Sequence, residues 1–264
     1  MALDIDLGGG LPKGRVTELF GPESSGKTTL LQHIMKLPSQ TGKVFFADEE
    51  GTVDEAWAEA CGVNMSNVCL SRGEVAEVSL ASVEMGIKSG LFDLVALDSV
   101  AALVPEKEFH GNYTDSHMGV LARLTSRFCR KAYSSINMVR RMHSKNIVVI
   151  LTNQIRMKIG VMWGNPEVTT GGKSIPFLAT VRIDLRKDSV LKDSKDAVIG
   201  QVSRYTVVKN KASNPLGKGE IHFYTAGKRT GTIDNYIPLL DWCLKLGVAK
   251  KSGAWYSFGG NDKF

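Results

Sequence analysis

A glycine-rich segment near the N-terminus has the residue types and the spacing of a phosphate-binding loop. Its residues are Gly21, Pro22, Glu23, Ser24, Ser25, Gly26, Lys27 and Thr28, and Thr29 follows them. The glycines let the backbone curl so that its N–H groups surround a phosphate, while Lys27 reaches the β- and γ-phosphates and Thr28 ligates Mg²⁺. An apolar run precedes the segment and an amphipathic run follows it, as this motif requires. The segment therefore predicts a nucleoside triphosphate site, and a plain glycine-rich turn is the alternative.

A carboxylate that could hold the metal ends a second apolar run. Residues 94–98 read Leu-Val-Ala-Leu-Asp, so Asp98 would lie at the carboxyl end of a strand, where parallel sheets bind ligands. We expect it to hold Mg²⁺ through a water molecule, beside Thr28. The alternative is an Asp that ends a strand and caps a helix.

Hydrolysis also needs a group that orients or deprotonates water opposite the γ-phosphate. Asp48, Glu49 and Glu50 end another expected strand at the same sheet edge. Their spacing alone does not choose among them. Asn153 and Gln154 follow the apolar run 147–151 and are placed to sense the γ-phosphate, although a polar pair can also simply end a strand.

The elements that position these residues follow from short apolar runs alternating with longer amphipathic ones. This alternation predicts helices around a parallel sheet, with strands at 16–20, 43–48, 67–70, 94–98 and 146–152. The first helix should begin at 26–28 and the longest should cover 118–144. Later strands, at 179–185, 202–209 and 220–225, have no helices between them and predict an antiparallel extension of the same sheet. A last helix at 237–246 and a glycine-rich tail complete one expected α/β domain, residues 1–264.

Composition places the chain among ordinary globular proteins. Of its 264 residues, 43% are hydrophobic and 23% are charged, which excludes disordered and fibrous classes. The four cysteines are too widely spaced for a structural zinc site or a disulfide framework. The chain has neither a run long and apolar enough to cross a bilayer nor a secretion leader. These features predict a cytoplasmic protein without a membrane partner.

The net charge of +6 is unevenly distributed. Residues 116–166 contain Lys and Arg but no Asp or Glu, whereas residues 48–59 are rich in acids. Residues 123, 127, 130 and 131 are basic and share one face of the longest expected helix. This distribution indicates two different partners, and a solvated basic surface is the alternative.

A long segment, residues 155–173, is too polar and glycine-rich for a strand or helix, so we expect a loop. Loops of that length are usually functional or disordered. Its Arg and Lys residues alternate with Met and Ile, which suits single-stranded DNA because cations neutralise phosphates and apolar side chains separate bases.

Several motifs together carry a family resemblance. In chain order they are GPESSGKTTL, LDSVAALVP, DSHMG, NQIRMKIGVMWGNPEVTTGG, VVKNK and GAWYS, and over essentially its whole length the chain resembles the bacterial and phage RecA recombinase family. The resemblance implies a RecA-like P-loop ATPase core with ATP and Mg²⁺ as cofactors. It further implies an ATP-dependent recombinase that forms a helical filament on single-stranded DNA, pairs it with double-stranded DNA, and serves DNA repair and the SOS response.

The resemblance also implies roles for individual residues around the nucleotide. It makes Glu50 the catalytic base, and it places Asp54 and Trp57 against the adenine. It makes Gln154 the link between the γ-phosphate and the DNA-binding loop. It implies that Lys209 and Lys211 reach the γ-phosphate of a neighbouring protomer.

On the DNA side, the resemblance implies two loops, 108–119 and 155–173. The implied contacts are Met118, Ser126, Arg130, Arg156, Met157, Lys158, Ile159, Gly171 and Gly172. Arg186 and Lys187 resemble part of a secondary site for the incoming duplex.

The sequence departs from the family pattern at several places. The usual N-terminal polymerisation segment and C-terminal domain have no counterpart, and Pro176 stands where the family usually has lysine. The region 130–146 is several residues longer than the pattern. These departures leave a DNA-binding or regulatory module without filaments as the alternative function. A hexameric helicase or clock-type ATPase with the same core is a second alternative, against which residues 154–172 argue.

Overall fold

A parallel sheet forms the centre of the computed structural model, which describes residues 2–112, 114–117, 119–158, 160, 164–213, 217–258 and 262–263. Its strands are β1 (Arg15–Gly21), β2 (Val44–Asp48), β3 (Val68–Ser71), β4 (Leu94–Asp98) and β5 (Val148–Met157). They lie in the order β1-β5-β4-β2-β3 and are all parallel. These pairings confirm the predicted parallel sheet. It could be predicted because strands buried on both faces read as continuous apolar runs in the sequence.

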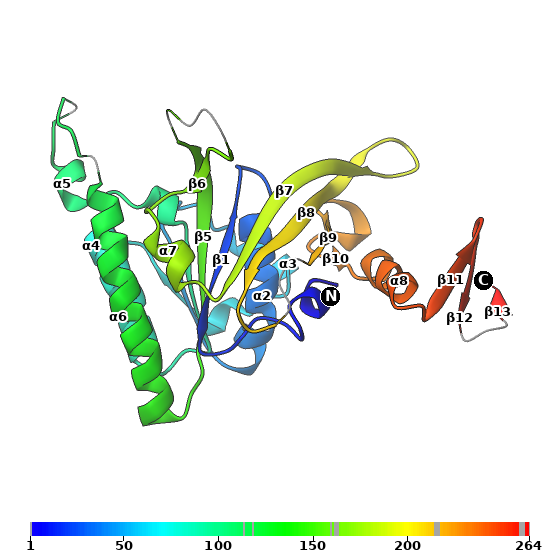
Figure 1. Cartoon of the computed structure of the whole chain (residues 1–264), viewed down its shortest axis with the longest axis horizontal. Coiled ribbons are helices and arrows are strands. Elements are labelled where there is room, and N and C mark those ends of the chain that lie inside the picture. Colours follow the sequence, from blue (N-terminus) through cyan, green and yellow to red (C-terminus); the bar gives the residue numbers. More distant parts are fainter. Residues whose placement is uncertain are drawn as a thin grey trace.

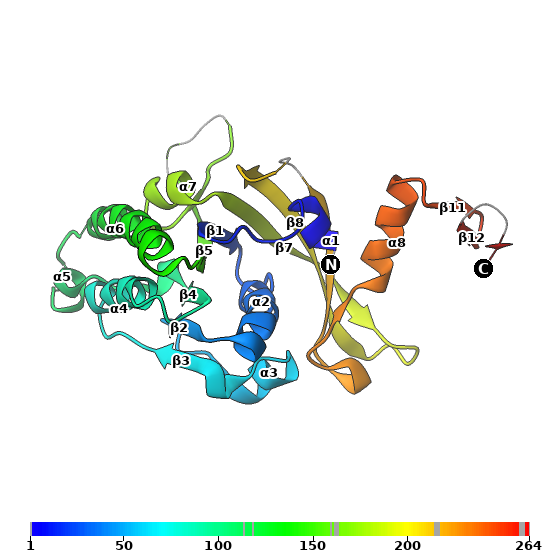
Figure 2. The same cartoon turned by 90° about the horizontal axis from the view of Figure 1, so that it is seen from below.

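Helices cover both faces of this sheet. On one face lies α2 (Lys27–Thr41), and on the other lie α4 (Ala76–Lys88) and α6 (Val120–His143); Figure 2 shows this arrangement. Each face has its own buried apolar cluster, one including Leu30 and Leu31 of α2 and the other including Val83 of α4 and Phe128 of α6. The shorter helices are α3 (Glu55–Ala60) and α5 (Glu106–Phe109), and α7 (Ser174–Leu178) precedes the next strand.

The sheet continues beyond β1 as the predicted antiparallel extension. β7 (Val181–Lys192) pairs in parallel with β1, and β8 (Val198–Asn210), β9 (Lys218–Tyr224) and β10 (Ile233–Asp234) follow in antiparallel order. β7 and β8 are longer than expected and form a hairpin that projects from the body of the molecule (Figure 1). This extension places β8 and β9 beside the segment that follows β1.

The chain after β10 corrects one expectation. The last helix, α8 (Tyr236–Lys245), is present, but a glycine-rich tail does not follow it directly. Instead β11 (Ala249–Ser252), β12 (Trp255–Phe258) and β13 (Asp262–Lys263) form a second, three-stranded sheet, which lies at the opposite end of the molecule from α6 (Figure 1). Gly253, at φ 61°, makes the tight turn between β11 and β12, and the aromatic residues after it favour a strand.

At the N-terminus, helix α1 (Ala2–Asp6) packs beside β9 and α8. Its last residue, Asp6, accepts a hydrogen bond from the hydroxyl of Tyr205, a fully buried residue of β8. No helix among the described residues is long and apolar enough to span a membrane.

The Tyr205 hydroxyl should contribute measurably to stability. We expect Tyr205→Phe to lower the free energy of unfolding by about 1 kcal/mol, because the ring still packs while the hydrogen bond to Asp6 is lost. Urea unfolding followed by circular dichroism measures this change. Tyr133→Phe on the exposed face of α6 is the control and should leave the urea midpoint where it is. Equal midpoints for both variants would show that α1 is not held through this bond.

Candidate functional site

The predicted phosphate-binding segment forms the turn between β1 and α2. It borders a cavity of about 430 Å³, lined by Glu23, Ser24, Ser25, Gly26, Lys27, Thr28, Thr29, Glu50, Gln154, Gln201, Phe223 and Thr225. Gly26 has φ 91° and Ser24 has φ 55°, so the backbone passes twice through the left-handed region as it curls. The predicted residues Gly21 and Pro22 do not line the cavity, and their carbonyl groups instead accept hydrogen bonds from Lys27.

Lys27 is the cation at the centre of this cavity, and only 8% of its surface is exposed. Its Nζ donates to the carbonyl oxygens of Gly21 (3.2 Å) and Pro22 (2.7 Å) and to Ser25 Oγ (3.5 Å). Burial lowers the pKa of Lys27, and the charges of Asp98, Glu50 and Glu23 oppose that shift. A largely buried ammonium group beside backbone N–H groups is suited to attract the phosphates of a nucleotide.

Asp98 lies at the end of β4, directly beside the first turn of α2. Its carboxylate is buried and accepts hydrogen bonds from Thr28 Oγ1 (2.7 Å) and from the Thr152 hydroxyl. Burial raises the pKa of Asp98, while these two hydrogen bonds oppose the shift. One carboxylate and one hydroxyl are hard oxygen donors of the kind that hold Mg²⁺ together with nucleotide phosphates. The carboxylate of Asp98 and the hydroxyl of Thr28 therefore fit Mg²⁺ that is also bound by nucleotide phosphates. Among the described residues there is no cluster of three or more His, Cys, Asp or Glu that could hold a metal ion.

The three acids after β2 have different partners. Asp48 accepts hydrogen bonds from two backbone N–H groups, those of Thr52 and Val53, and pairs with Arg72 at 3.0 Å. Glu49 points to α4, where it accepts a hydrogen bond from Ser79 Oγ at 2.6 Å, and burial raises its pKa. Only Glu50 of the three lines the cavity.

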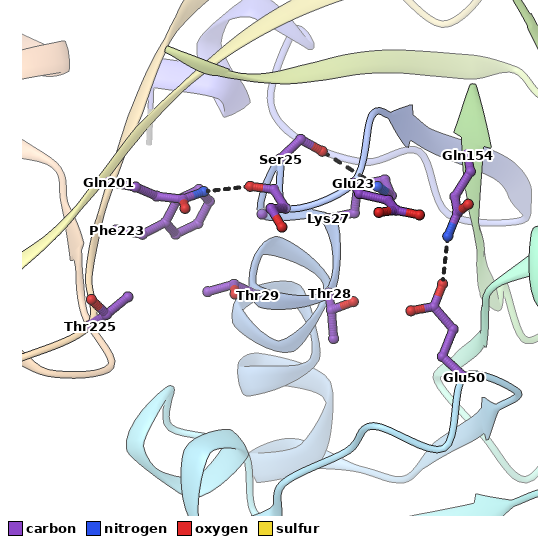
Figure 3. A pocket seen from close by; sticks show the side chains of 12 residues that line it. Glu23, Ser25, Lys27, Thr28, Thr29, Glu50, Gln154, Gln201, Phe223 and Thr225 are labelled. Atoms are coloured by element: carbon purple, nitrogen blue, oxygen red, sulfur yellow. Dashed lines mark hydrogen bonds between the residues drawn. The ribbon is translucent and has the colours of Figure 1, made fainter. Parts of the chain in front are cut away.

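Glu50 and Gln154 meet at one end of the cavity. Glu50 Oε1 accepts hydrogen bonds from Ser99 Oγ (2.6 Å) and from Gln154 Nε2 (3.3 Å), and Figure 3 shows the two side chains pointing toward one another. Asn153, the other half of the polar pair, is buried and donates to Glu18 and to the carbonyl of Thr170. The structure thus places one residue of each group at the cavity, Glu50 among the three acids and Gln154 of the polar pair, and gives the others different partners.

The expectation that residues 155–173 lack regular structure is wrong. β5 continues to Met157, and β6 (Glu167–Thr169) pairs with it in antiparallel register, Ile155 opposite Thr169. The β-branched residues at 155, 168 and 169 favour this pairing. Gln154 in the cavity and the exposed Arg156 and Met157 are therefore neighbours on one strand.

The far side of the same segment packs against α6. Thr125 Oγ1 donates to the carbonyl of Gly171 at 2.6 Å. Gly171 and Gly172 have φ 84° and 76°, and a Cβ on Gly171 would lie 3.1 Å from Thr125 Cγ2. Glycine is therefore required by the close approach and by the backbone.

The other predicted DNA contacts lie mostly on exposed surface. Lys158 is exposed, and Arg130 on α6 donates to Ser126 Oγ at 3.0 Å. Met118 and Ile159 lie outside the described residues. Arg186 is neutralised by the carboxylates of Glu167 (3.0 and 2.5 Å) and Asp184 (3.0 Å), whereas its neighbour Lys187 is exposed.

Two pairs of predicted nucleotide residues are not brought to the cavity. Asp54 caps α3 by accepting a hydrogen bond from the N–H of Trp57 at 3.1 Å, and neither residue lines the cavity. Lys209 lies near the far end of β8 and Lys211 directly follows that strand, and neither lines the cavity of its own chain. Lys209 Nζ donates to the carbonyl oxygens of Pro176 (2.7 Å) and Phe177 (3.2 Å), and burial lowers its pKa, with Lys211 adding to the shift.

Sequence reasoning missed the residues at the opposite end of the cavity from Glu50. Gln201, Phe223 and Thr225 line it there (Figure 3), and they come from the region of β8 and β9. The alternation of polar and apolar residues marks these strands in the sequence, but it does not reveal that their register brings them beside the phosphate-binding turn.

Comparisons with known proteins agree with this arrangement. Residues 1–228 match the family described as the RecA N-terminal domain. The chain is 46% identical over 263 residues to Protein RecA of Thioalkalivibrio sulfidiphilus, covering 98% of this chain and 73% of that protein. It is 44% identical to Protein RecA of Methylococcus capsulatus over 99% of this chain and 73% of the relative, and 44% identical to that of Geobacter sulfurreducens over 99% and 75%. The chain therefore belongs to the RecA family, the ATP-dependent DNA recombinases that its motifs resemble.

Proposed function

We propose that the chain hydrolyses ATP in response to single-stranded DNA and uses this cycle to drive strand exchange. The observation that carries the proposal is the continuity of β5, which has Gln154 in the nucleotide cavity and Arg156 exposed two residues later. β5 pairs with β1 up to Gln154 and with β6 from Ile155 to Met157, so a displacement at Gln154 would be passed along a strand that is paired at each of these positions. Occupation of the cavity and the position of the DNA segment are thereby coupled through one element.

The roles of the cavity residues follow from their positions. Lys27 and the backbone N–H groups of the turn would bind the β- and γ-phosphates, and Thr28 with Asp98 would hold Mg²⁺, which neutralises charge on the phosphate oxygens when bound. Glu50 would accept the proton of the attacking water, since its carboxylate lines the cavity. Gln154 would contact the γ-phosphate and is hydrogen-bonded to that base.

The surface that meets DNA would be formed by Arg156, Met157 and Lys158 at the end of β5, with the basic face of α6 beside it. The predicted contacts at Met118, Ile159, Ser126, Arg130, Gly171 and Gly172 belong to the same proposal. Arg186 needs a change of partner before it can bind a duplex, because Glu167 and Asp184 hold it now.

A second copy of the chain would complete the catalytic site. Lys209, half-buried near the end of β8, and Lys211, exposed just after it, do not line their own cavity. In a helical filament they would lie against the γ-phosphate held by the neighbouring protomer and stabilise the charge of the transition state. Asp54 and Trp57 would contact the adenine once a nucleotide is bound. We further propose that residues 1–264 form one domain, and that the protein acts in DNA repair in the cytoplasm.

Single-stranded DNA should raise the rate of ATP hydrolysis by about tenfold or more, an effect of roughly 1.4 kcal/mol or more on the barrier. A coupled assay of ADP release with and without an oligonucleotide measures it, and electron micrographs of the same sample with a non-hydrolysable ATP analogue show the assembly. Filaments together with stimulation support the proposal. Turnover that ignores DNA would contradict the coupling, and discrete monomers would favour the regulatory module instead.

DNA affinity should fall steeply with salt. For single strands, the slope of log K against log[salt] is about −0.7 for each phosphate neutralised. We expect Arg156→Ala and Lys158→Ala each to make that slope less steep by about 0.7, measured by fluorescence anisotropy of a labelled oligonucleotide. Lys192→Ala, at the distal end of β7 in an ion pair with Asp196, is the control. If the DNA affinity of the unmodified protein does not change with salt, the basic surface does not bind DNA phosphates as proposed.

A further inference from the structure

A buried serine of the antiparallel extension lies directly behind the phosphate-binding turn. Ser203, in β8, is fully buried, and its Oγ donates to the carbonyl oxygen of Ser25 at 2.9 Å. The same Oγ accepts a hydrogen bond from Gln201 Nε2 at 3.0 Å, and that amide also lies 3.4 Å from the carbonyl oxygen of Ser24. Two consecutive carbonyl groups of the turn are thus held by side chains of β8.

These two hydrogen bonds fix the direction of two peptide planes. In a trans peptide the C=O and the following N–H point to opposite sides. When β8 holds the carbonyl of Ser25, the N–H of Gly26 is directed away from β8, and the carbonyl of Ser24 has the same relation to the N–H of Ser25. Ser25 and Gly26 both line the nucleotide cavity, and neither N–H group is directed at the β8 side chains that hold the carbonyls.

The turn needs such support because its backbone is unusual. Ser24 has a positive φ of 55° without being glycine, a conformation that costs free energy and persists only where surrounding contacts hold it. Gly26 is packed against the same wall, since a Cβ there would lie 2.9 Å from Phe223 Cε2 and 3.1 Å from Gln201 Nε2. The extension therefore packs directly against the turn, and Gln201 and Phe223 also line the cavity beside it.

We propose that Ser203, assisted by Gln201, is a positioning residue for nucleotide binding. It acts through the backbone of Ser24, Ser25 and Gly26, which it holds with the N–H groups already aimed at the phosphates before a nucleotide arrives. The inference rests on the proposed nucleotide site, and it adds to that site a determinant from a strand outside the glycine-rich motif.

Ser203→Ala tests this role. The dissociation constant of MgADP, measured by calorimetry without DNA, should rise about tenfold, the effect expected when a buried hydrogen bond that orders a binding loop is lost. KM for ATP should rise by a similar factor while kcat with saturating single-stranded DNA stays within about twofold, because contacts to the phosphates are made in both the ground state and the transition state. Ser203→Thr keeps the hydroxyl and should restore the affinity.

Ser135→Ala is the matched control. Ser135 is an equally buried serine on α6 whose Oγ has no hydrogen-bond partner among the described residues, so its loss should leave nucleotide affinity unchanged. MgADP binding by Ser203→Ala equal to that of the unmodified protein would overturn the proposal. So would an equal loss of affinity in Ser135→Ala.

Gln201→Ala gives a second test if Ser203→Ala does not fold. Gln201 is only partly buried, and its removal should weaken MgADP binding about threefold, consistent with a longer hydrogen bond. Unchanged binding in that variant would count against the proposal. Because nucleotide affinity is measured without DNA, a failure of DNA-stimulated turnover in the unmodified protein would contradict the proposed function and leave this result standing.

Discussion

Lys27→Ala should reduce ATP hydrolysis by about 10³-fold or more, because it removes the only cation among the residues that line the described cavity. The reason is electrostatic. Asp98, Glu50 and Glu23 lie close enough to Lys27 to act on its charge, so without the ammonium group an incoming triphosphate would meet these carboxylates with no cationic side chain lining the described cavity. Steady-state ADP release with saturating single-stranded DNA measures the loss.

The control for this prediction is Lys36→Ala. Lys36 lies further along the same helix and packs against Gly62, so its removal should leave turnover unchanged. Lys27→Arg should also be nearly inactive, since a planar guanidinium group cannot replace a compact ammonium group that donates to Gly21 and Pro22. Substantial turnover by Lys27→Ala would show that the phosphates bind elsewhere.

Glu50→Gln should bind ATP and DNA normally but hydrolyse ATP about 10²- to 10⁴-fold more slowly, the range expected when a general base is lost. The amide keeps the size of the carboxylate and still accepts a hydrogen bond from Ser99. Nucleotide binding is therefore expected to stay intact while proton abstraction is lost. Calorimetry with a non-hydrolysable analogue and ADP release with DNA measure the two properties separately.

Glu49→Gln is the matched control for the Glu50 prediction. The two residues are adjacent, but Glu49 is bonded to Ser79 and Gly73 and does not line the cavity. Its replacement should lower stability slightly and leave kcat unchanged. Normal turnover by Glu50→Gln would show that Glu50 is not the catalytic base and would leave Glu49 and Asp48 as the candidates.

Much of the parallel sheet and its nucleotide edge could be predicted from the sequence, because both depend on local chemistry. Strands such as β2 and β4 are buried along their whole length, so they read as unbroken apolar runs. The phosphate-binding turn is likewise specified by adjacent residues whose backbone must curl. Its position between β1 and α2 needed no long-range information.

The choice among Asp48, Glu49 and Glu50 could not be predicted from spacing, because it depends on how two strand ends meet. The N–H groups of Glu49 and Glu50 both lie within hydrogen-bond distance of the carbonyl of Asp98 (2.7 and 3.3 Å), so the backbone that carries both side chains is held against the end of β4. Family resemblance singled out Glu50, and the geometry gives a physical reason for its position. The neighbouring acids point elsewhere because Asp48 pairs with Arg72 and Glu49 accepts a hydrogen bond from Ser79.

The wall formed by Gln201 and Phe223 depends on register across strands far apart in the chain. Gln201 pairs with Phe223 between β8 and β9, and both lie beside a turn that begins almost two hundred residues earlier. A one-residue slip in that register would point both side chains to the other face. Local sequence patterns contain no such information. The pairing of β5 with β6 has a different explanation, because the polar and glycine-rich residues between these strands hide the β-branched residues that pair.

Because β5 is an extended strand, the number of residues between Gln154 and Arg156 decides which face of the strand Arg156 occupies. Side chains alternate between faces along a strand, so Gln154 and Arg156 share a face while Ile155 and Met157 share the other. Evolution can lengthen this connection by two residues and keep the cation on the side of the glutamine, but a single inserted residue exchanges the basic and apolar faces that DNA would meet.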